Sequence, residues 1–353
     1  MPIKIKDSLT KITRPEAEKV DRQNHQRLDR NEKTDLFDKE NFTKIIRTIN
    51  SYDLVAYPNL EPLYKAIVFN LNIPRDQILL TTGGDQGVKM IFETFETDFV
   101  INSNPNYAMY SVYANMFGVK EKIYNYDNNL KIDTKNLISK IDHRTKLIII
   151  SNPGHNGILI KTEDVIKVIK NALKNNCLVV IDEAYIDFSK EESLVRFIKK
   201  FNNLIILRTM SKAYGIASLR VGYLLSQKEN IESLYKVKPV YEVSGLSSKI
   251  ATYLINNQGI KNDYVKTIQK NKIFLINFFE KLKINYLQSD TNFIYFSVNL
   301  RNDDLFEFLK ERDIFIKKAP KVYPFSKYLR LTIGNKNQMI FFIEAVKLFL
   351  KKL

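Results

Sequence analysis

The stretch Leu204-Ile205-Ile206-Leu207 runs directly into Arg208-Thr209, and it sets the pattern for the middle of the chain. An unbroken apolar run that ends in polar residues predicts a strand buried on both faces. Similar segments lie upstream, at Ile78-Leu79-Leu80, Lys146-Leu147-Ile148-Ile149-Ile150 and Leu178-Val179-Val180-Ile181. Helical spacing separates them, for example at Val88, Ile91, Phe92 and Phe95. We therefore expect an α/β protein with a mostly parallel central sheet.

The pattern changes after about residue 240. Helical stretches at 304–312 and 338–350 alternate with strand-like segments at 292–296 and 329–333. This arrangement predicts a second, smaller α+β domain. We assign residues 1–45 to an N-terminal arm and part of the small domain, 46–240 to the large domain, and 241–353 to the small C-terminal domain.

The composition bears on the classes of partner. Fifty-five Lys and Arg residues against 39 Asp and Glu give a net charge of +16, which raises the question of nucleic-acid binding. The lysines are scattered along the whole chain without a zinc-finger or ribonucleoprotein motif, so we expect diffuse surface charge and no nucleic acid partner. No apolar run suits a membrane span or a secretory signal, and the single cysteine, Cys177, excludes internal disulfides. We expect a cytoplasmic protein with no membrane partner and no metal.

Polar motifs follow the predicted strands in a characteristic order. The stretch from Leu207 to Tyr223, which contains Ser211-Lys212-Ala213-Tyr214-Gly215, resembles the lysine motif of fold-type-I pyridoxal-phosphate (PLP) enzymes. It is most similar to the histidinol-phosphate aminotransferase branch of the class I/II aminotransferases. The segment 180–188 resembles the aspartate motif of that branch. Four more matches follow the same order, at Ala56-Tyr57-Pro58, Thr82-Gly83-Gly84-Asp85-Gln86-Gly87, Pro105-Asn106-Tyr107-Ala108-Met109-Tyr110 and Leu329-Arg330-Leu331-Thr332-Ile333-Gly334.

The resemblance, which spans roughly residues 27 to 345, implies catalytic roles for three residues. Lys212 would form the internal aldimine with the cofactor and then act as the base that moves the Cα proton. Asp182 would keep the pyridine nitrogen protonated, because a neighbouring carboxylate favours the positive charge. Tyr185 would donate a hydrogen bond to the O3′ oxygen of the cofactor.

The resemblance also implies a set of binding residues. The cofactor phosphate would be held by Gly84 and Asp85 through backbone N–H groups, and by Thr209, Ser211 and Arg220. Tyr107 would stack on the ring. Tyr57 would reach the phosphate of the neighbouring subunit, which implies a homodimer. Arg330 would pair with the α-carboxylate of the amino acid, a bidentate task that suits a guanidinium.

The sequence departs from the branch in two places. The turn Asn152-Pro153-Gly154-His155-Asn156-Gly157 is about one residue shorter than its counterpart. We favour Asn156 for the contact with O3′, with Asn152 second. For His155 two interpretations stay open, a contact with the pocket and a structural role in the turn, and we favour the structural role. Where relatives place an arginine that grips the substrate phosphate, this chain offers Lys317, and the alternative is that Lys317 is a solvated surface charge. The N-terminal tyrosine segment of the histidine-pathway enzymes has no clear match.

The sequence therefore predicts an aminotransferase that exchanges an amino group between an amino acid, glutamate in the first place, and a small, phosphorylated or otherwise anionic keto compound. One alternative is a PLP-dependent amino-acid-phosphate decarboxylase or another lyase of the same branch. A second alternative is a PLP-binding fold that has lost catalysis and serves as a regulator or scaffold.

Overall fold

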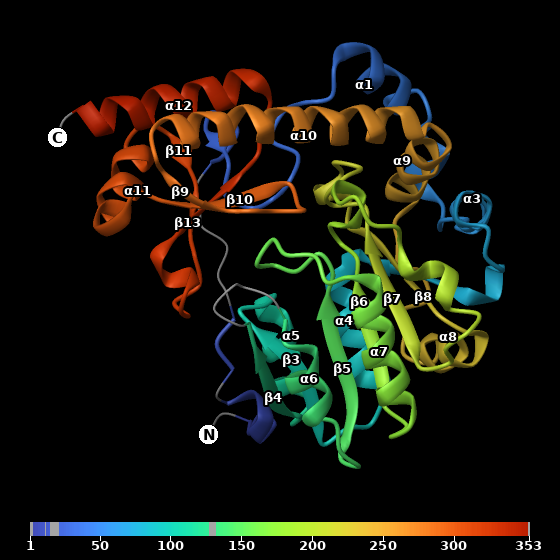
Figure 1. Ribbon diagram of the computed structural model, residues 1–353. Helices are drawn as coiled ribbons and strands as arrows, with labels where there is room; N and C mark the ends of the chain where they lie inside the picture. The colour runs from blue at the N-terminus through green and yellow to red at the C-terminus, as the bar shows by residue number, and fades with distance from the viewer. Residues whose placement is uncertain (1–2, 11, 15–20, 127–131, 352–353) are drawn as a thin grey trace.

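The computed structural model describes residues 3–10, 12–14, 21–126 and 132–351, and two main sheets of unequal size dominate it (Figure 1). In this described part the larger sheet has the spatial order β2 (Ile78–Thr82), β8 (Val221–Leu225), β7 (Leu204–Thr209), β6 (Leu178–Asp182), β5 (Thr145–Ser151), β3 (Phe99–Asn104) and β4 (Lys120–Asn125). Neighbouring strands pair in parallel, except that β8 runs antiparallel to both β2 and β7. The predicted mostly parallel sheet is confirmed.

The large sheet is buried on both faces, as its continuous apolar strands require. Within β6, Val179 and Ile181 belong to one hydrophobic cluster, whereas Leu178 and Val180 belong to another. Successive side chains of a strand point to opposite faces, so each cluster fills one side of the sheet. One face is covered by α4 (Gly83–Thr94), α5 (Ala108–Met116) and α8 (Lys228–Tyr235). The other is covered by α3 (Glu61–Leu71), α6 (Thr134–Ser139), α7 (Thr162–Leu173) and α9 (Gly245–Asn256).

The smaller sheet is antiparallel, with the order β12 (Lys317–Lys318), β13 (Leu329–Thr332), β10 (Phe293–Ser297) and β9 (Asn285–Leu287). It packs against α10 (Gln258–Lys281), α11 (Asn302–Lys310) and α12 (Lys336–Lys351). The Phe279 and Phe296 rings stack in this core with their centroids 5.2 Å apart. From the N-terminal segment, β1 (Gln26–Arg27) pairs in parallel with β11 (Ile314–Phe315). The predicted smaller α+β unit is confirmed.

The helix α10 extends across both units (Figure 1). The preceding helix, α9, contributes Ile250, Ala251 and Leu254 to the core of the large sheet, whereas Tyr264 and Leu275 of α10 belong to the core of the small one. This packing supports a domain division early in α10, later than residue 240. We propose that the large domain extends to about residue 257.

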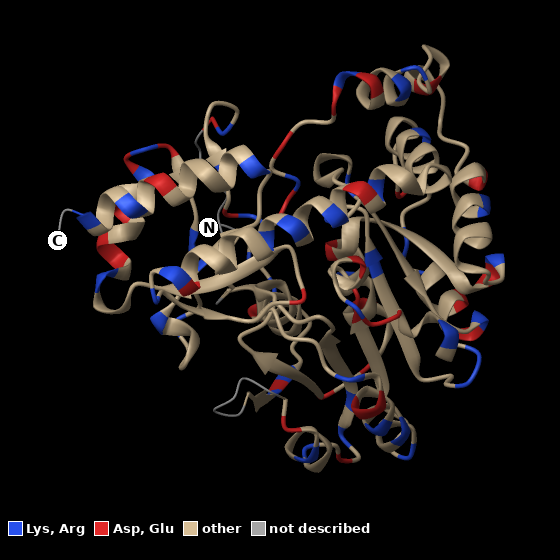
Figure 2. Ribbon diagram, turned by 45° about the horizontal axis from the view of Figure 1, so that its top comes forward, with Lys and Arg blue, Asp and Glu red and all other residues tan. Residues whose placement is uncertain are grey.

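Basic and acidic residues are interspersed over both parts of the molecule (Figure 2). The short helices α1 (Lys39–Ile46) and α2 (Tyr52–Val55) lead from the N-terminal segment to the large domain. Cys177 is buried, as expected for a small hydrophobic residue. Within the described ranges, none of the helices has the length and apolar character that crossing a membrane requires.

Candidate active site

A cavity of about 730 Å³ lies where the carboxyl ends of the large-sheet strands face the small domain. Ser151, Asp182 and Thr209 line it from the ends of β5, β6 and β7, and Arg330 lines it from β13. The carboxyl ends of parallel strands meet at one edge of a sheet, which brings these distant residues together. The residues predicted from sequence that line the cavity are Gly84, Asp85, Tyr107, Asp182, Tyr185, Thr209, Ser211, Lys212, Arg220, Lys317 and Arg330.

Asp182 is a buried carboxylate, and among the described residues it accepts hydrogen bonds only from neutral donors. Its Oδ1 accepts from the backbone N–H of Ala184 at 2.9 Å, and its Oδ2 accepts from the hydroxyl of Tyr110. Burial raises the pKa of Asp182, and the hydrogen bonds from Tyr110 and Ala184 only partly oppose this shift. A protonated ring nitrogen beside Asp182 would supply a cation that none of these contacts provides, and so the site fits a pyridine ring.

Lys212 lies on the loop that follows β7, and its amine is not held in an ion pair with any described carboxylate. Its Nζ donates to the backbone oxygen of Arg30 at 3.2 Å, and it lies 5.6 Å from the centroid of the Tyr185 ring. A primary amine held by a single carbonyl in a cavity can be released to bond covalently with an aldehyde. The structure therefore fits the role predicted for Lys212.

One end of the cavity is built for an anion. The helix α4 begins at Gly83, and its first N–H groups, which include those of Gly84 and Asp85, have no partner within the helix. The Arg220 Nη1 lies 3.4 Å from the hydroxyl of Ser211, which in turn is 3.0 Å from the hydroxyl of Thr209. Backbone donors, hydroxyls and a guanidinium together suit a phosphate dianion.

Gly83 is needed at this end for two reasons. Its φ of +72° is unfavourable for other residues, and a Cβ at this position would lie 2.6 Å from the Arg220 Nη2. The close approach of Gly83 thus lets the Arg220 guanidinium lie directly beside the start of α4.

Two tyrosines flank the cavity. Tyr107 packs edge-on against Tyr110, and its hydroxyl lies 3.4 Å from Asp85 Oδ1. Tyr185 is buried, and its hydroxyl accepts a hydrogen bond from Asn31 Nδ2 at 3.0 Å. An aromatic ring and a phenol that both line the cavity fit a flat heteroaromatic ring with a polar substituent.

Arg330 is held in place by two contacts. Its Nη2 donates to the backbone oxygen of Asp29 at 2.7 Å, and its Nη1 lies 2.8 Å from His155 Nε2. The Arg330 Nε has no partner among the described residues. Burial, together with the charges of Arg330 and Lys212, holds the pKa of His155 well below its usual value of 6.5. His155 therefore lines the cavity and contacts Arg330, which agrees with the alternative of a pocket contact and not with the favoured structural role in the turn.

The two asparagines of the same turn differ in what they leave free. Both polar atoms of Asn152 bond the main chain of Ile160, with Nδ2 donating to the oxygen at 3.1 Å and Oδ1 accepting from the nitrogen at 2.8 Å. Asn156 uses its Oδ1 to accept from the N–H of Ile158, whereas its buried Nδ2 has no partner among the described residues. Neither asparagine lines the cavity. The unpartnered Nδ2 makes Asn156 the better of the two candidates for the O3′ contact.

Two predicted residues lie at or beyond the rim. Lys317 of β12 lies directly opposite Arg330 of β13 in the small sheet. No hydrogen bond or ion pair joins the Lys317 side chain to another described residue. The Nζ atom of the adjacent Lys318 lies 2.6 Å from Asp303 Oδ1 and 4.0 Å from Glu307 Oε1. Tyr57 is 80% exposed, stacks on Tyr241 and is not part of the cavity. In this subunit the structure does not bring Tyr57 to the other site residues.

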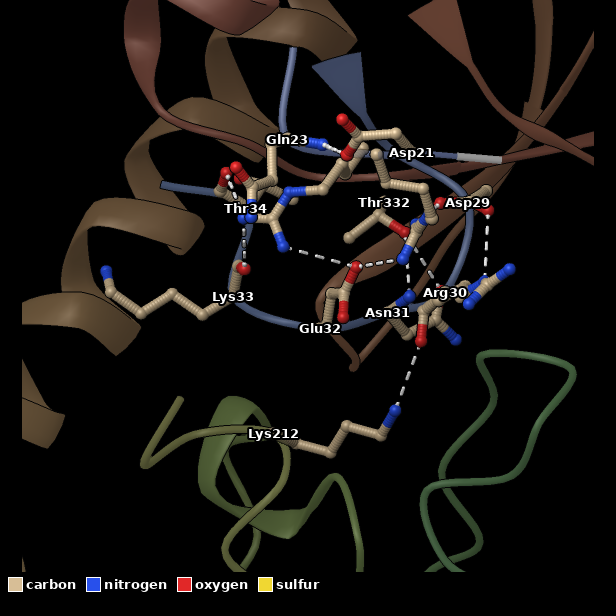
Figure 3. Close-up of polar contacts among 12 residues, drawn as sticks. Asp21, Gln23, Asp29, Arg30, Asn31, Glu32, Lys33, Thr34, Lys212 and Thr332 are labelled. Atoms are coloured by element: carbon tan, nitrogen blue, oxygen red, sulfur yellow. Dashed lines mark hydrogen bonds and ion pairs between the residues drawn. The ribbon is translucent and has the colours of Figure 1, made fainter. Parts of the chain in front are cut away.

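One part of the site comes from the N-terminal segment and was not predicted from the sequence. Asp29, Arg30 and Asn31 line the cavity, although the sequence pattern predicts only an N-terminal arm and part of the small domain for residues 1–45. The segment passes directly above Lys212 (Figure 3). These residues lack helical or strand periodicity, and the only local signal was an unbroken polar run before the first expected helix.

Comparisons with known proteins agree with the geometry. The profile of the family "Aminotransferase class I and II" matches residues 35–346. The histidinol-phosphate aminotransferase of Buchnera aphidicola subsp. Cinara cedri is 34% identical over 313 residues, which cover 85% of this chain and 87% of that protein. The crystal structure of the histidinol-phosphate aminotransferase from Clostridium acetobutylicum is 26% identical, with a TM-score of 0.79 over 89% of this chain and 95% of that one.

A third similarity concerns the cofactor. The structure of histidinol-phosphate aminotransferase from Sinorhizobium meliloti in complex with pyridoxal-5′-phosphate has the same fold, with a TM-score of 0.83, 20% identity and 91% coverage of both chains. The family match and the chemistry of the cavity point to one cofactor. The chain thus belongs to the class I and II aminotransferases and is a pyridoxal-phosphate-dependent enzyme.

Proposed function

We propose that this enzyme transfers an amino group between an amino acid, glutamate in the first place, and a small keto compound that carries an anionic group. The observation that carries the proposal is the distribution of cations around Lys212. Arg220 lies at the anion-binding end of the cavity, and Arg330 and Lys317 line it from the small domain. The anion-binding end thus suits the phosphate of the cofactor. Of the other cations that line the cavity, Arg30 and Lys318 are paired with Asp29 and Asp303, whereas Arg330 and Lys317 have no described carboxylate partner and suit a substrate with two negative groups.

The roles of the individual residues follow from their positions. When bound, the cofactor supplies an electron sink through its ring. Asp182 holds a proton on the ring nitrogen, and Tyr185 donates a hydrogen bond to the ring oxygen. The Lys212 Nζ would take the proton from the substrate Cα and deliver it to C4′ of the cofactor, the carbon on the other side of the shared nitrogen. Arg330 binds the α-carboxylate and so fixes the Cα–H bond relative to Lys212.

Two observations bear on the identity of the acceptor. The similar proteins from Buchnera and Clostridium are named histidinol-phosphate aminotransferases, which places the keto partner of histidinol phosphate first among the acceptors to test. Lys317 supports an anionic acceptor, because its charge is not neutralised by a described carboxylate as that of Lys318 is. A lysine provides a point charge, so we expect the site to accept phosphate and carboxylate groups with little geometric discrimination.

The proposal is tested by the two halves of the reaction. Protein loaded with pyridoxal phosphate should be yellow, and borohydride should attach the cofactor to Lys212. Glutamate alone should convert the bound cofactor to its amine form, and the keto partner of histidinol phosphate should restore the aldehyde form. Release of carbon dioxide from an amino-acid phosphate, without formation of the amine form, would instead identify a decarboxylase.

We further propose that two subunits share each site. The support is an exposed apolar patch around Tyr57, which consists of Tyr52, Leu54, Val55, Tyr57, Val240 and Tyr241. Large apolar side chains gathered on a surface are typical of protein–protein interfaces. Tyr57 lies outside the cavity of its own subunit, which fits a role in the cavity of a partner.

A further inference from the structure

Three consecutive residues of the N-terminal segment contact three groups of the active site. The backbone oxygen of Asp29 accepts from Arg330, and that of Arg30 accepts from Lys212. The side chain of Asn31 donates to Tyr185. Asn31 is 1% exposed and has a left-handed backbone with a φ of 55°. A left-handed backbone and the burial of a polar side chain both lower stability unless hydrogen bonds compensate for them. The donor and the acceptor in each hydrogen bond of Asn31 therefore matter.

The orientation of the Asn31 amide is fixed by Thr332, which lies beside it in Figure 3. The backbone N–H of Asn31 donates to Thr332 Oγ1 at 3.0 Å. Thr332 Oγ1 lies 3.1 Å from Asn31 Oδ1, and because an amide oxygen can only accept, the threonine hydroxyl is the donor in this contact. The Oδ1 atom is thereby turned toward Thr332, and Nδ2, which can only donate, is turned toward Tyr185.

This order of donors has a consequence for Tyr185. A phenol has one proton, and the Tyr185 oxygen accepts from Asn31, so its own proton must point elsewhere. The described residues provide no hydrogen-bond acceptor for that proton, and Tyr185 lines the cavity. We propose that Asn31 is a positioning residue that fixes Tyr185 as a hydrogen-bond donor toward the ring oxygen of the cofactor. This inference rests on the proposed role of Tyr185.

The test compares the pH dependence of the bound cofactor spectrum in several variants. A hydrogen-bond donor to the ring oxygen stabilises negative charge on that oxygen. It therefore lowers the pKa of the nearby nitrogen that joins Lys212 to the cofactor. Tyr185→Phe should therefore raise the midpoint of the spectral transition by about one pH unit or more. Asn31→Asp keeps the shape but can only accept from the phenol, so it should raise the midpoint by a similar amount.

Two controls separate this effect from its alternatives. Asn31→Asp also adds a charge, but in a Tyr185→Phe background it should cause little further shift if it acts through the phenol. Asn72 also has a left-handed backbone and is exposed far from the cavity, so Asn72→Asp controls for the substitution itself and should leave the midpoint unchanged. If Asn31→Asp does not fold, Asn31→Gly tolerates the backbone and should raise the midpoint by a smaller amount.

The outcomes distinguish the inference from the function on which it rests. An unchanged midpoint in Asn31→Asp or, if that variant does not fold, in Asn31→Gly, together with a shift in Tyr185→Phe, overturns the role of Asn31 and leaves that of Tyr185 intact. If Asn31→Asp raises the midpoint by the same amount in the Tyr185→Phe background as in the wild-type protein, the role of Asn31 is also overturned, because the new charge then acts directly on the cofactor. An unchanged midpoint in Tyr185→Phe overturns both roles. Loss of borohydride labelling at Lys212 in the wild-type protein would overturn the proposed function itself.

Discussion

The Nε2 atom of His155 lies 2.8 Å from the Nη1 atom of Arg330. A guanidinium can only donate, so this ring nitrogen must be the acceptor and cannot carry a proton. The lowered pKa of His155 agrees with that state. Neutral His155 thus accepts a hydrogen bond from one Nη atom of the Arg330 guanidinium, the group that we expect to bind the substrate carboxylate.

The first prediction concerns the pH dependence of stability. The pKa of His155 lies below 6.5 in the folded protein, so the unfolded chain binds more protons as the pH falls below 6.5. The free energy of unfolding should decrease in that range, and His155→Gln should remove this part of the decrease. Urea unfolding of the cofactor-free protein between pH 5 and 8 measures the effect. His143 is exposed, and a matching loss of pH dependence in His143→Gln would argue against the assignment.

The second prediction sets activity against stability at Asp182. Burial raises the pKa of this carboxyl, so its ionised form destabilises the cofactor-free protein at pH values above 3.8. Asp182→Asn removes the charge and nearly keeps the shape. Its cofactor-free form should melt at a higher temperature at pH 7, while turnover should fall at least about a hundredfold, as for the loss of a strong electrostatic contact. A variant within a few-fold of wild-type turnover would contradict the role of Asp182.

The third prediction compares two adjacent lysines. Lys317→Ala should raise the KM for the keto acceptor about tenfold or more, as expected for a lost charge-assisted contact of ~1.5–3 kcal/mol. Lys318→Ala is the matched control, because its charge is already paired with Asp303. The half-reaction with glutamate should change much less. If the acceptor KM stays constant while glutamate binding weakens, Lys317 does not belong to the acceptor site.

The fourth prediction concerns subunits that share a site. Lys212→Ala and Tyr57→Ala subunits should each be weakly active alone. After mixing and exchange, a hybrid dimer would have one site with both Lys212 and Tyr57, so a one-to-one mixture should recover about a quarter of wild-type activity. Sedimentation should show a dimer at micromolar concentration. Monomers with full activity, or mixtures that recover nothing, would refute the shared site.

The sequence was informative where function follows local pattern. The strands have continuous apolar runs because both of their faces are buried, and a polar residue directly after such a strand must lie at the carboxyl edge. Asp182 and Thr209 were predictable on this basis. Asn31 was not, since the Thr332 that fixes its amide lies 301 positions away and no local periodicity encodes that contact. The two interpretations of His155 could not be separated from the sequence for the same reason, because its partner Arg330 comes from the other domain.

The cross-strand position of Lys317 opposite Arg330 limits the length of a substrate that both side chains can bind. Residues directly opposite on antiparallel strands have Cα atoms roughly 4.5–5.5 Å apart and side chains on the same face. A hinge motion of the small domain would alter their separation from Lys212 but not from each other. In a homologous series of acids with negative groups at both ends, we therefore expect one optimal spacer, with shorter members reaching only one cation and longer members forced to bend.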